Sequence, residues 1–439
     1  MTPCRLSRLC LSAALVLVLV LAANGRALAS DPLPAGTHPR VAVTAPTRLD
    51  WVFSLANQSP ARPPAEWSRG YKSTEQSYQL IVPSGLPGKL PAGHALPLVL
   101  FISPSNGPSG AAQWKQTCQR NGILFASPHA AGNRCPFPQR VHIVLDVLDD
   151  IRRRYPIDPD RTYLAGFSGG GRVACTIGFA LPEYFGGVIS VCAAGDLRPE
   201  SWLRRRVVDR LSVALITGET DFNRSEVERF RGPLLKEVGV RTRSWVQAGS
   251  GHAIPAGPNP AVFKWLEQDR PRRVALAKTW PASRTDPQAA IGRRAWARAL
   301  LAEASKRLVT PATIYSGLMQ LKGIRVRWND LPEAEQAQRI LQDYDSRPQR
   351  PWEQEDIAEQ RRFLVARARS LDAYGSGPLP KQYAGGRANM LKAALGLWSR
   401  VLQDGRDKTA VKQARERIPI LRKLLADTEP DPNGDPGEA

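Results

Sequence analysis

Short β-rich segments alternate with helical ones between Ser77 and about Gln268, and this alternation restricts the chain to a few folds. The β-rich segments are SYQLIVP, PLVLFIS, GILFASP, TYLAGF, GGVISVC, LSVALITG and TRSWVQA. Between some of them lie AAQWKQTCQRN, VHIVLDVLDDIRRRY, GGRVACTIGFALP and EVERFRGPLLKEV, in which apolar residues recur at helical spacing. Strands that alternate with helices pair in parallel through crossover connections. The sequence therefore predicts an α/β fold with an open, mostly parallel sheet and flanking helices.

The β signal ends at RPRR, residues 270–273. Six later segments carry apolar residues every three or four positions, which predicts an all-α domain of helix pairs over residues 271–426. These pairs are similar to tetratricopeptide-type arrays, although no repeat of fixed period fits them. We further expect a Pro-rich lead-in over 30–72, a catalytic domain over 73–270 and a disordered tail over 427–439.

The first 29 residues have the layout of a secretory signal peptide. Arg5 and Arg8 precede an apolar run from Leu9 to Ala23, and a small-x-small cleavage site ends at Ala29. An uncleaved membrane anchor is the alternative, but the run is shorter than the ~18 residues that a spanning helix needs. We therefore expect an exported protein, located in the periplasm or outside the cell.

The chain is strongly basic, with a formal net charge of +21. Such a charge suits an anionic partner, for instance an envelope polymer, lipid headgroups or an acidic polysaccharide. The basic residues are scattered along the chain rather than gathered in a stripe, and a bias of composition towards arginine explains them equally well. We expect no nucleic-acid partner.

The candidate nucleophile is Ser168, in the pentapeptide Gly166-Phe167-Ser168-Gly169-Gly170. This run fits G-x-S-x-G, and it stands between a predicted buried strand and a predicted helix, as a strained strand-turn-helix nucleophile requires. The glycines let the strand and helix backbones approach closely. A structural turn that merely contains a serine is the alternative.

A serine hydroxyl needs a base, and the base needs an acid to orient it. Asp221 follows the strand LSVALITG and His252 follows the next strand, TRSWVQA, so both should lie at the carboxyl edge of the sheet beside Ser168. Asp221 could instead cap a helix, with Glu219 or Asp196 as the acid, and His252 could be a surface histidine.

The oxyanion formed during acyl transfer needs two backbone N–H donors. One should come from Gly169, the residue after the nucleophile, and the other from the loop after PLVLFIS. Pro104 in that loop has no N–H, which leaves Ser105 or Asn106.

The run from YQLIVPSGL through RYPIDPDRTYLAGFSGGG to GSGHAIP resembles secreted esterases of the α/β-hydrolase superfamily. The group comprises polyhydroxybutyrate depolymerases, feruloyl esterases and acetylxylan esterases, and the resemblance covers about residues 72–270. It implies that Ser168, Asp221 and His252 form the catalytic triad. The chain departs from the group in two places. Ser103-Pro104 stands where the group usually has His-Gly, and Gly169 stands where the group commonly has a larger residue after the nucleophile.

Four cysteines follow the predicted signal peptide, namely Cys118, Cys135, Cys175 and Cys192. An even number in an exported protein allows two disulfides, and we expect the local pairs Cys118–Cys135 and Cys175–Cys192. Buried free thiols are the alternative for the second pair. The chain has neither a CxxC pair nor two histidines at helical spacing, so we expect no metal and no other cofactor.

The leading hypothesis is an exported serine carboxylic-ester hydrolase that works through an acyl-enzyme, on an ester of unknown size. A serine peptidase of the same fold is one alternative. A cell-envelope binding or scaffold protein with a degenerate hydrolase domain is another. The helical domain could bind a protein or an envelope polymer, cover the active-site mouth, or simply dock.

Overall fold

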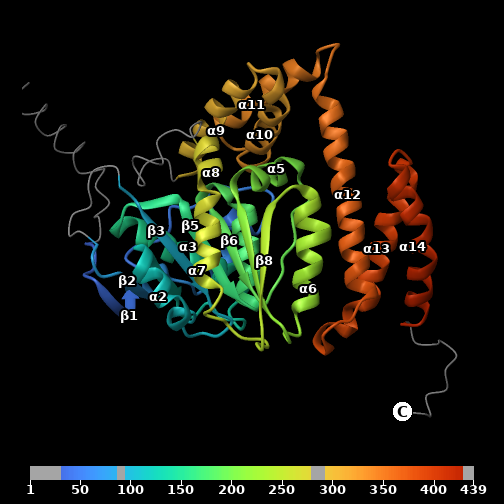
Figure 1. Ribbon diagram of the computed structural model, residues 1–439. Coiled ribbons are helices and arrows are strands. Elements are labelled where there is room, and N and C mark those ends of the chain that lie inside the picture. Colours follow the sequence, from blue (N-terminus) through green and yellow to red (C-terminus); the bar gives the residue numbers. More distant parts are fainter. Residues whose placement is uncertain (1–30, 87–93, 278–291, 429–439) are drawn as a thin grey trace, which may run out of the picture.

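The computed structural model describes residues 31–86, 94–277 and 292–428, and Figure 1 shows an α/β body with a helical region packed along one flank. The signal peptide expected over residues 1–29 lies outside the described residues, as does most of the expected tail.

The α/β body is built on one sheet of eight strands in the order β1-β2-β4-β3-β5-β6-β7-β8. The six strands β3 to β8 pair in parallel with one another. Strand β2 pairs antiparallel with β4 on one side and with β1 on the other. The bounds are β1 Gly36–Ala42, β2 Ser77–Val82, β3 Leu96–Ile102, β4 Leu124–Pro128, β5 Ile157–Phe167, β6 Gly187–Val191, β7 Ser212–Gly218 and β8 Arg241–Gln247. All seven predicted strands are confirmed.

Strand β1 was not predicted, because it falls in the segment expected to be a Pro-rich lead-in. It is an exposed edge strand that contains Pro39, and only one of its residues is buried, so it shows little of the apolar pattern of a central strand. By contrast, every residue of β6 and β7 is buried. Strands buried on both faces read as continuous apolar runs, which is why the inner strands could be recognised.

Helices cover both faces of the sheet (Figure 1). The four predicted helical segments are present, and α5, α7 and α8 are additional. The bounds are α2 Ala111–Asn121, α3 Phe137–Arg154, α4 Gly169–Ala180, α5 Ser201–Arg210, α6 Arg224–Arg229, its π-helical continuation η5 Phe230–Lys236, α7 Asn259–Gln268 and α8 Arg270–Ala277. Across the three described ranges, no helix is both long and apolar enough to span a membrane.

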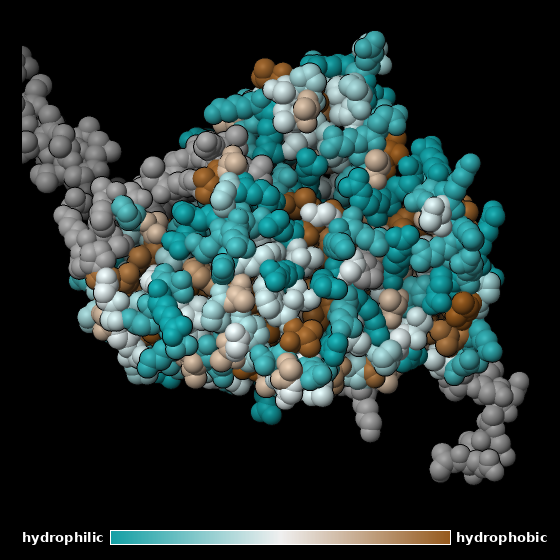
Figure 2. All heavy atoms as spheres, viewed as in Figure 1, coloured by the Kyte–Doolittle hydropathy of each residue, from teal (hydrophilic) through white to brown (hydrophobic). Residues whose placement is uncertain are grey.

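The predicted helix pairs after residue 273 are confirmed as α9 Arg293–Arg307, α10 Ile314–Arg327, α11 Pro332–Asp345, α12 Trp352–Ser376, α13 Arg387–Asp404 and α14 Lys408–Ala426. The first three share one apolar core with the α/β body, through residues such as Trp296 and Trp328. The helices α12 to α14 have a core of their own around Trp398, and α12 also contributes Phe363 and Ala366 to the shared core. On the face in Figure 2 the surface is mostly hydrophilic, and apolar residues lie in small separate groups.

Buried ion pairs attach the helical region to the α/β body. Arg327, at the end of α10, donates from Nε to Asp50 (2.8 Å) and pairs with Glu183, and all three side chains are almost fully buried. Arg204 on α5 pairs with Glu359 on α12 at 2.9 Å. Buried charges tolerate little displacement from their partners. The helical region is therefore docked firmly rather than held by its linker alone.

The expected disulfides are not formed, since all four described cysteines are free. Cys118 lies beside the start of β4 and Cys135 follows its far end, and five strand residues span about 16 Å, well beyond disulfide reach. Cys175 and Cys192 belong to apolar cores on opposite faces of the sheet. Both pairing predictions were therefore wrong, and the free-thiol alternative for the second pair agrees with the structure.

We expect each of the four cysteines to be alkylated when the protein is unfolded without a reductant. The measurement is peptide mapping after treatment with iodoacetamide in denaturant. In the native protein only Cys135 should react quickly, because the other three thiols are buried. Recovery of a disulfide-linked peptide that joins Cys118 to Cys135 would contradict the structure.

A second prediction concerns His142 on α3. Its ring stacks on Trp51, with 4.2 Å between ring centroids, and its Nε2 lies 3.6 Å from Asp146 Oδ1. Burial lowers the pKa of His142 to about 4 and raises that of Asp146 to about 6. In the unfolded chain this histidine takes up a proton below about pH 6.5, whereas in the folded protein it stays neutral. Protonation of His142 in the unfolded chain therefore lowers the free energy of unfolding as the pH falls to 4.

The variant His142→Phe keeps a stacking ring but removes that titration. We therefore expect the free energy of unfolding of the wild type to fall by about 3 kcal/mol relative to that of His142→Phe between pH 7 and 4. Urea unfolding at several pH values measures this difference. A difference that is constant over that range would refute the assignment to His142.

Candidate active site

Ser168 stands on a sharp turn between β5 and α4, with φ 52° and ψ −121°. A left-handed φ is strained for a residue other than glycine, and such strain is typical of a nucleophile turn. A Cβ at Gly166 would lie 2.4 Å from the backbone of Gly170, and one at Gly170 would lie 2.0 Å from the carbonyl oxygen of Ile102. The G-x-S-x-G pattern is thus required by the packing of β3, β5 and α4.

The structure brings the three predicted triad residues together from three loops at the carboxyl edge of the sheet. His252 Nε2 lies 3.0 Å from Ser168 Oγ, and His252 Nδ1 lies 2.8 Å from Asp221 Oδ1. Both distances are those of hydrogen bonds. The imidazole therefore bridges the serine hydroxyl and the carboxylate, which is the arrangement needed for proton transfer from Ser168.

Asp221 is buried and well supplied with hydrogen-bond donors. Burial alone would raise the pKa of this carboxyl, but donation from the backbone N–H of Asn223 (3.0 Å), from Thr217 Oγ1 (2.7 Å) and from His252 outweighs burial and lowers it. The carboxylate is thus held ionised and oriented towards the imidazole.

The two other acids considered from the sequence have different partners. Glu219 is exposed and accepts from the backbone N–H of Gly249 at 2.9 Å. Asp196 pairs with Arg367 on α12 at 3.4 Å. In the part of the chain that the structure describes, Asp221 is the acid hydrogen-bonded to His252.

Two aromatic rings flank the imidazole of His252. Phe222 stacks on it with 4.0 Å between ring centroids, and Phe167 lies at 4.8 Å. Phe222 is 49% exposed, so it stands at the surface between solvent and the histidine. Sequence reasoning missed Phe222, although its position directly after Asp221 was a usable signal.

The two predicted oxyanion donors differ in the structure. The Gly169 N–H opens α4 and has no acceptor among the described residues. The Ser105 N–H instead donates to Ser103 Oγ at 3.1 Å, within its own turn. A Cβ at Gly169 would lie 2.1 Å from Asn133 Oδ1, so the packed side chain of Asn133 explains why this position is glycine.

Arg140 on α3 was not predicted, and it holds this region in place. The buried guanidinium donates to the carbonyl oxygen of Ala131 (2.6 Å), to Asn133 Oδ1 (3.0 Å) and to the carbonyl oxygen of Ser103 (2.9 Å). It therefore ties the loop after β3 to the loop after β4, and both loops lie against the start of α4.

Within the described ranges, one group of side chains has metal-ligand geometry, namely Cys192, Asp221 and His252, whose ligand atoms lie within 4.8 Å of one another. Two of these atoms already form the hydrogen bond between the acid and the base. Burial, together with the nearby Asp221 carboxylate, raises the pKa of Cys192 to about 12, so the thiolate that a metal needs is disfavoured. We assign no metal here.

The order of the strands, the serine turn after β5, the acid after β7 and the histidine after β8 define an α/β-hydrolase. The predicted fold class is thus confirmed. No model of a known protein family matches the chain.

Two curated relatives match by sequence. A poly(3-hydroxybutyrate) depolymerase of Ralstonia pickettii is 29% identical over 98 residues, which cover 19% of this chain and 20% of that protein. A protein described as "Putative esterase NocK", from Nocardia uniformis subsp. tsuyamanensis, is 30% identical over 167 residues, covering 33% of this chain and 45% of that protein. The chain thus spans less than half the length of either relative. The resemblance to polyhydroxybutyrate depolymerases and esterases that the motifs predicted is thus confirmed.

Solved structures that resemble the chain include Est1E from Butyrivibrio proteoclasticus, with 14% identity, a TM-score of 0.34 and coverage of 46% of this chain and 95% of that chain. A thermostable esterase has 23% identity, a TM-score of 0.34 and coverage of 44% and 59%.

Proposed function

We propose that the protein is a serine carboxylic-ester hydrolase in which Ser168 is the nucleophile, His252 the general base and acid, and Asp221 the residue that orients the imidazole. The observation that carries the proposal is the pair of hydrogen bonds of His252, to Ser168 Oγ at 3.0 Å and to Asp221 at 2.8 Å. The names of the two sequence relatives, a poly(3-hydroxybutyrate) depolymerase and a putative esterase, favour an ester over other acyl substrates.

The reaction follows from this geometry. Ser168 Oγ attacks the ester carbonyl carbon while its proton passes to His252 Nε2, and the carbonyl oxygen becomes an oxyanion near the Gly169 N–H. The bond to the alcohol oxygen then breaks, and the alcohol leaves with the proton from Nε2. Water attacks the acyl-enzyme by the same route, which releases the acid and restores Ser168.

Ester and amide substrates separate this proposal from the peptidase alternative. We expect the purified protein to hydrolyse p-nitrophenyl esters and to release little p-nitroaniline from blocked or unblocked peptide anilides. Faster turnover of an anilide than of every ester in the series would favour a peptidase instead.

Arg140 is proposed as a positioning residue for the oxyanion loops. Arg140→Met removes three hydrogen bonds that hold them, and we expect kcat to fall by about 10- to 100-fold while KM changes little, because the loss falls on the transition state. Arg140→Lys should restore part of the rate, since it keeps the charge but not the planar fork of donors. Equal losses in both variants, or a rise of KM alone, would count against this role.

The proposal includes export, which rests on the layout of the first 29 residues. Fractionation of cells that express the full chain, followed by N-terminal sequencing of the product, tests it. Export predicts a mature chain that begins at or near Ser30.

A further inference from the structure

Phe222 presents an apolar ring to solvent beside the base of the proposed reaction. The residue is 49% exposed. Its ring stacks on the His252 imidazole, with 4.0 Å between ring centroids and 29° between the ring planes. Nε2, an atom of that imidazole, lies 3.0 Å from Ser168 Oγ. The exposed ring is therefore one ring contact away from the atoms that carry out the proposed proton transfer.

The neighbours of Phe222 in the chain hold it in this position. Asp221 and Asn223, on either side of it, are almost fully buried. The Asn223 N–H donates to Asp221 Oδ1 at 3.0 Å, and Asn223 Nδ2 donates to the carbonyl oxygen of Cys192 at 3.0 Å. The Arg224 N–H donates to the carbonyl oxygen of Asp221 at 3.0 Å. Because both neighbours are anchored, the ring cannot withdraw into the core without breaking these hydrogen bonds.

The proposed reaction places the alcohol part of the ester beside His252. In the tetrahedral intermediate the carbonyl oxygen lies near the Gly169 N–H, whereas the alcohol oxygen accepts the proton from His252 Nε2. When the bond from the acyl carbon to this oxygen breaks, its electron pair stays on the oxygen and the proton neutralises it. Proton transfer requires the oxygen and Nε2 to be within hydrogen-bond distance. The alcohol group therefore starts beside the imidazole and the ring stacked on it.

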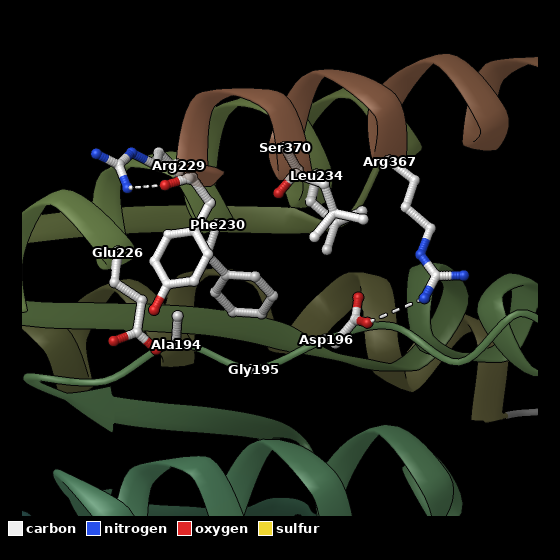
Figure 3. A pocket seen from close by; sticks show the side chains of 11 residues that line it. Ala194, Gly195, Asp196, Glu226, Arg229, Phe230, Leu234, Arg367 and Ser370 are labelled. Carbon is white, nitrogen blue, oxygen red and sulfur yellow. Dashed lines mark hydrogen bonds and ion pairs between the residues drawn. The ribbon is translucent and has the colours of Figure 1, made fainter. Parts of the chain in front are cut away.

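The cavity beside α12 does not provide a site for this group. It has a volume of about 190 Å³, and four of the side chains in its walls are charged (Figure 3). Two of them, Asp196 and Arg367, pair at 3.4 Å. The described residues that line the cavity include neither Ser168 nor His252. We therefore look for the alcohol site on the open surface that Phe222 forms.

We propose that Phe222 is the binding surface for the alcohol part of the ester, and that it selects esters of bulky apolar alcohols over esters of small ones. The inference rests on the proposed function of Ser168 and His252. An apolar group that packs on Phe222 is removed from water, and an aromatic group gains a further contact between rings. The loop that carries His252, residues 251–257, contains no Asp, Glu, Lys or Arg, which favours an uncharged alcohol group.

The test keeps the acid constant and varies the alcohol. Ethyl acetate and 2-phenylethyl acetate release alcohols of nearly equal acidity, so their rates differ through binding of the alcohol group. The variants are Phe222→Ala, which removes the ring, and Phe222→Leu, which keeps a smaller apolar side chain. The matched control is Ile420→Ala on α14, which truncates an apolar residue of similar exposure, 45%.

For each protein, kcat/KM is measured with both acetates and with ethyl butyrate by titration of the acid released. The rate at which a small fluorophosphonate labels Ser168 is measured in parallel. We expect the wild type to prefer 2-phenylethyl acetate to ethyl acetate, and Phe222→Ala to lower that ratio by about fivefold or more. The ratio of ethyl butyrate to ethyl acetate should change by less than about twofold, because it reports the acyl side.

Phe222→Leu should give a smaller loss in the same direction, which keeps the test decisive if the alanine variant does not fold. The inference is overturned if the ratio of the two acetates in both Phe222 variants equals that in Ile420→Ala. An equal loss for both acetates together with slower labelling also overturns it, because the ring would then only hold the imidazole. Failure of the proposed function is a separate result, since the wild type would then neither be labelled nor hydrolyse any of the three esters.

Discussion

Ser168→Ala should lower kcat for ester hydrolysis by about a millionfold, which in practice means no turnover above background. The alanine removes the only atom that can form the acyl-enzyme, while the backbone of the turn is unchanged. The small loss of one hydroxyl should leave the unfolding midpoint close to that of the wild type. The measurement is release of p-nitrophenol from the acetate ester, with circular dichroism to establish the fold.

A serine on the helical region provides the control. Ser399→Ala changes the same group on the exposed side of α13 and should leave kcat unaltered. Turnover of Ser168→Ala within about a hundredfold of the wild type, in a preparation free of other esterases, would show that another group acts as the nucleophile.

The second large effect concerns stability, at the contact between α10 and the α/β body. Arg327→Met should lower the free energy of unfolding by about 3–5 kcal/mol, because Asp50 then remains buried without its counter-charge and Glu183 keeps only the charge of Arg206 nearby. Trp328 Nε1 still donates to Asp50 (3.0 Å), but it brings no charge. Urea unfolding followed by tryptophan fluorescence measures the change.

The matched control removes an exposed pair. Arg347→Met breaks its contact with Asp343 at the end of α11, where both side chains are in solvent, so the unfolding midpoint should hardly move. Adding Glu183→Gln to Arg327→Met should recover part of the lost stability, since it removes one buried charge that Arg327 no longer neutralises. A loss in Arg327→Met no larger than in Arg347→Met would mean that the buried network does not attach α10 to the α/β body.

The parts of the fold that follow from local sequence were predictable. Strands β6 and β7 are buried on both faces and read as unbroken apolar runs, and α9 to α14 each carry an apolar face. Ser168, Asp221 and His252 could be selected because each follows a strand, and parallel strands bring their carboxyl ends to one edge.

Other features depend on contacts between residues far apart in the chain. The Arg140 guanidinium donates three hydrogen bonds to two loops, and nothing near Arg140 in the sequence indicates them. The expected pair Cys175–Cys192 looked local, but the sheet separates the two thiols. The docking of α12 on the α/β body depends on Arg204, Arg229 and Arg367, which are three among many arginines of a basic chain.

The central claim is that Ser168 is an activated nucleophile, and a fluorophosphonate probe tests this claim most directly. We predict that the purified wild type is labelled once, that peptide mass spectrometry places the adduct on Ser168, and that His252→Ala and Ser168→Ala abolish labelling. A folded wild-type protein that does not react, or an adduct on another residue, would contradict the account.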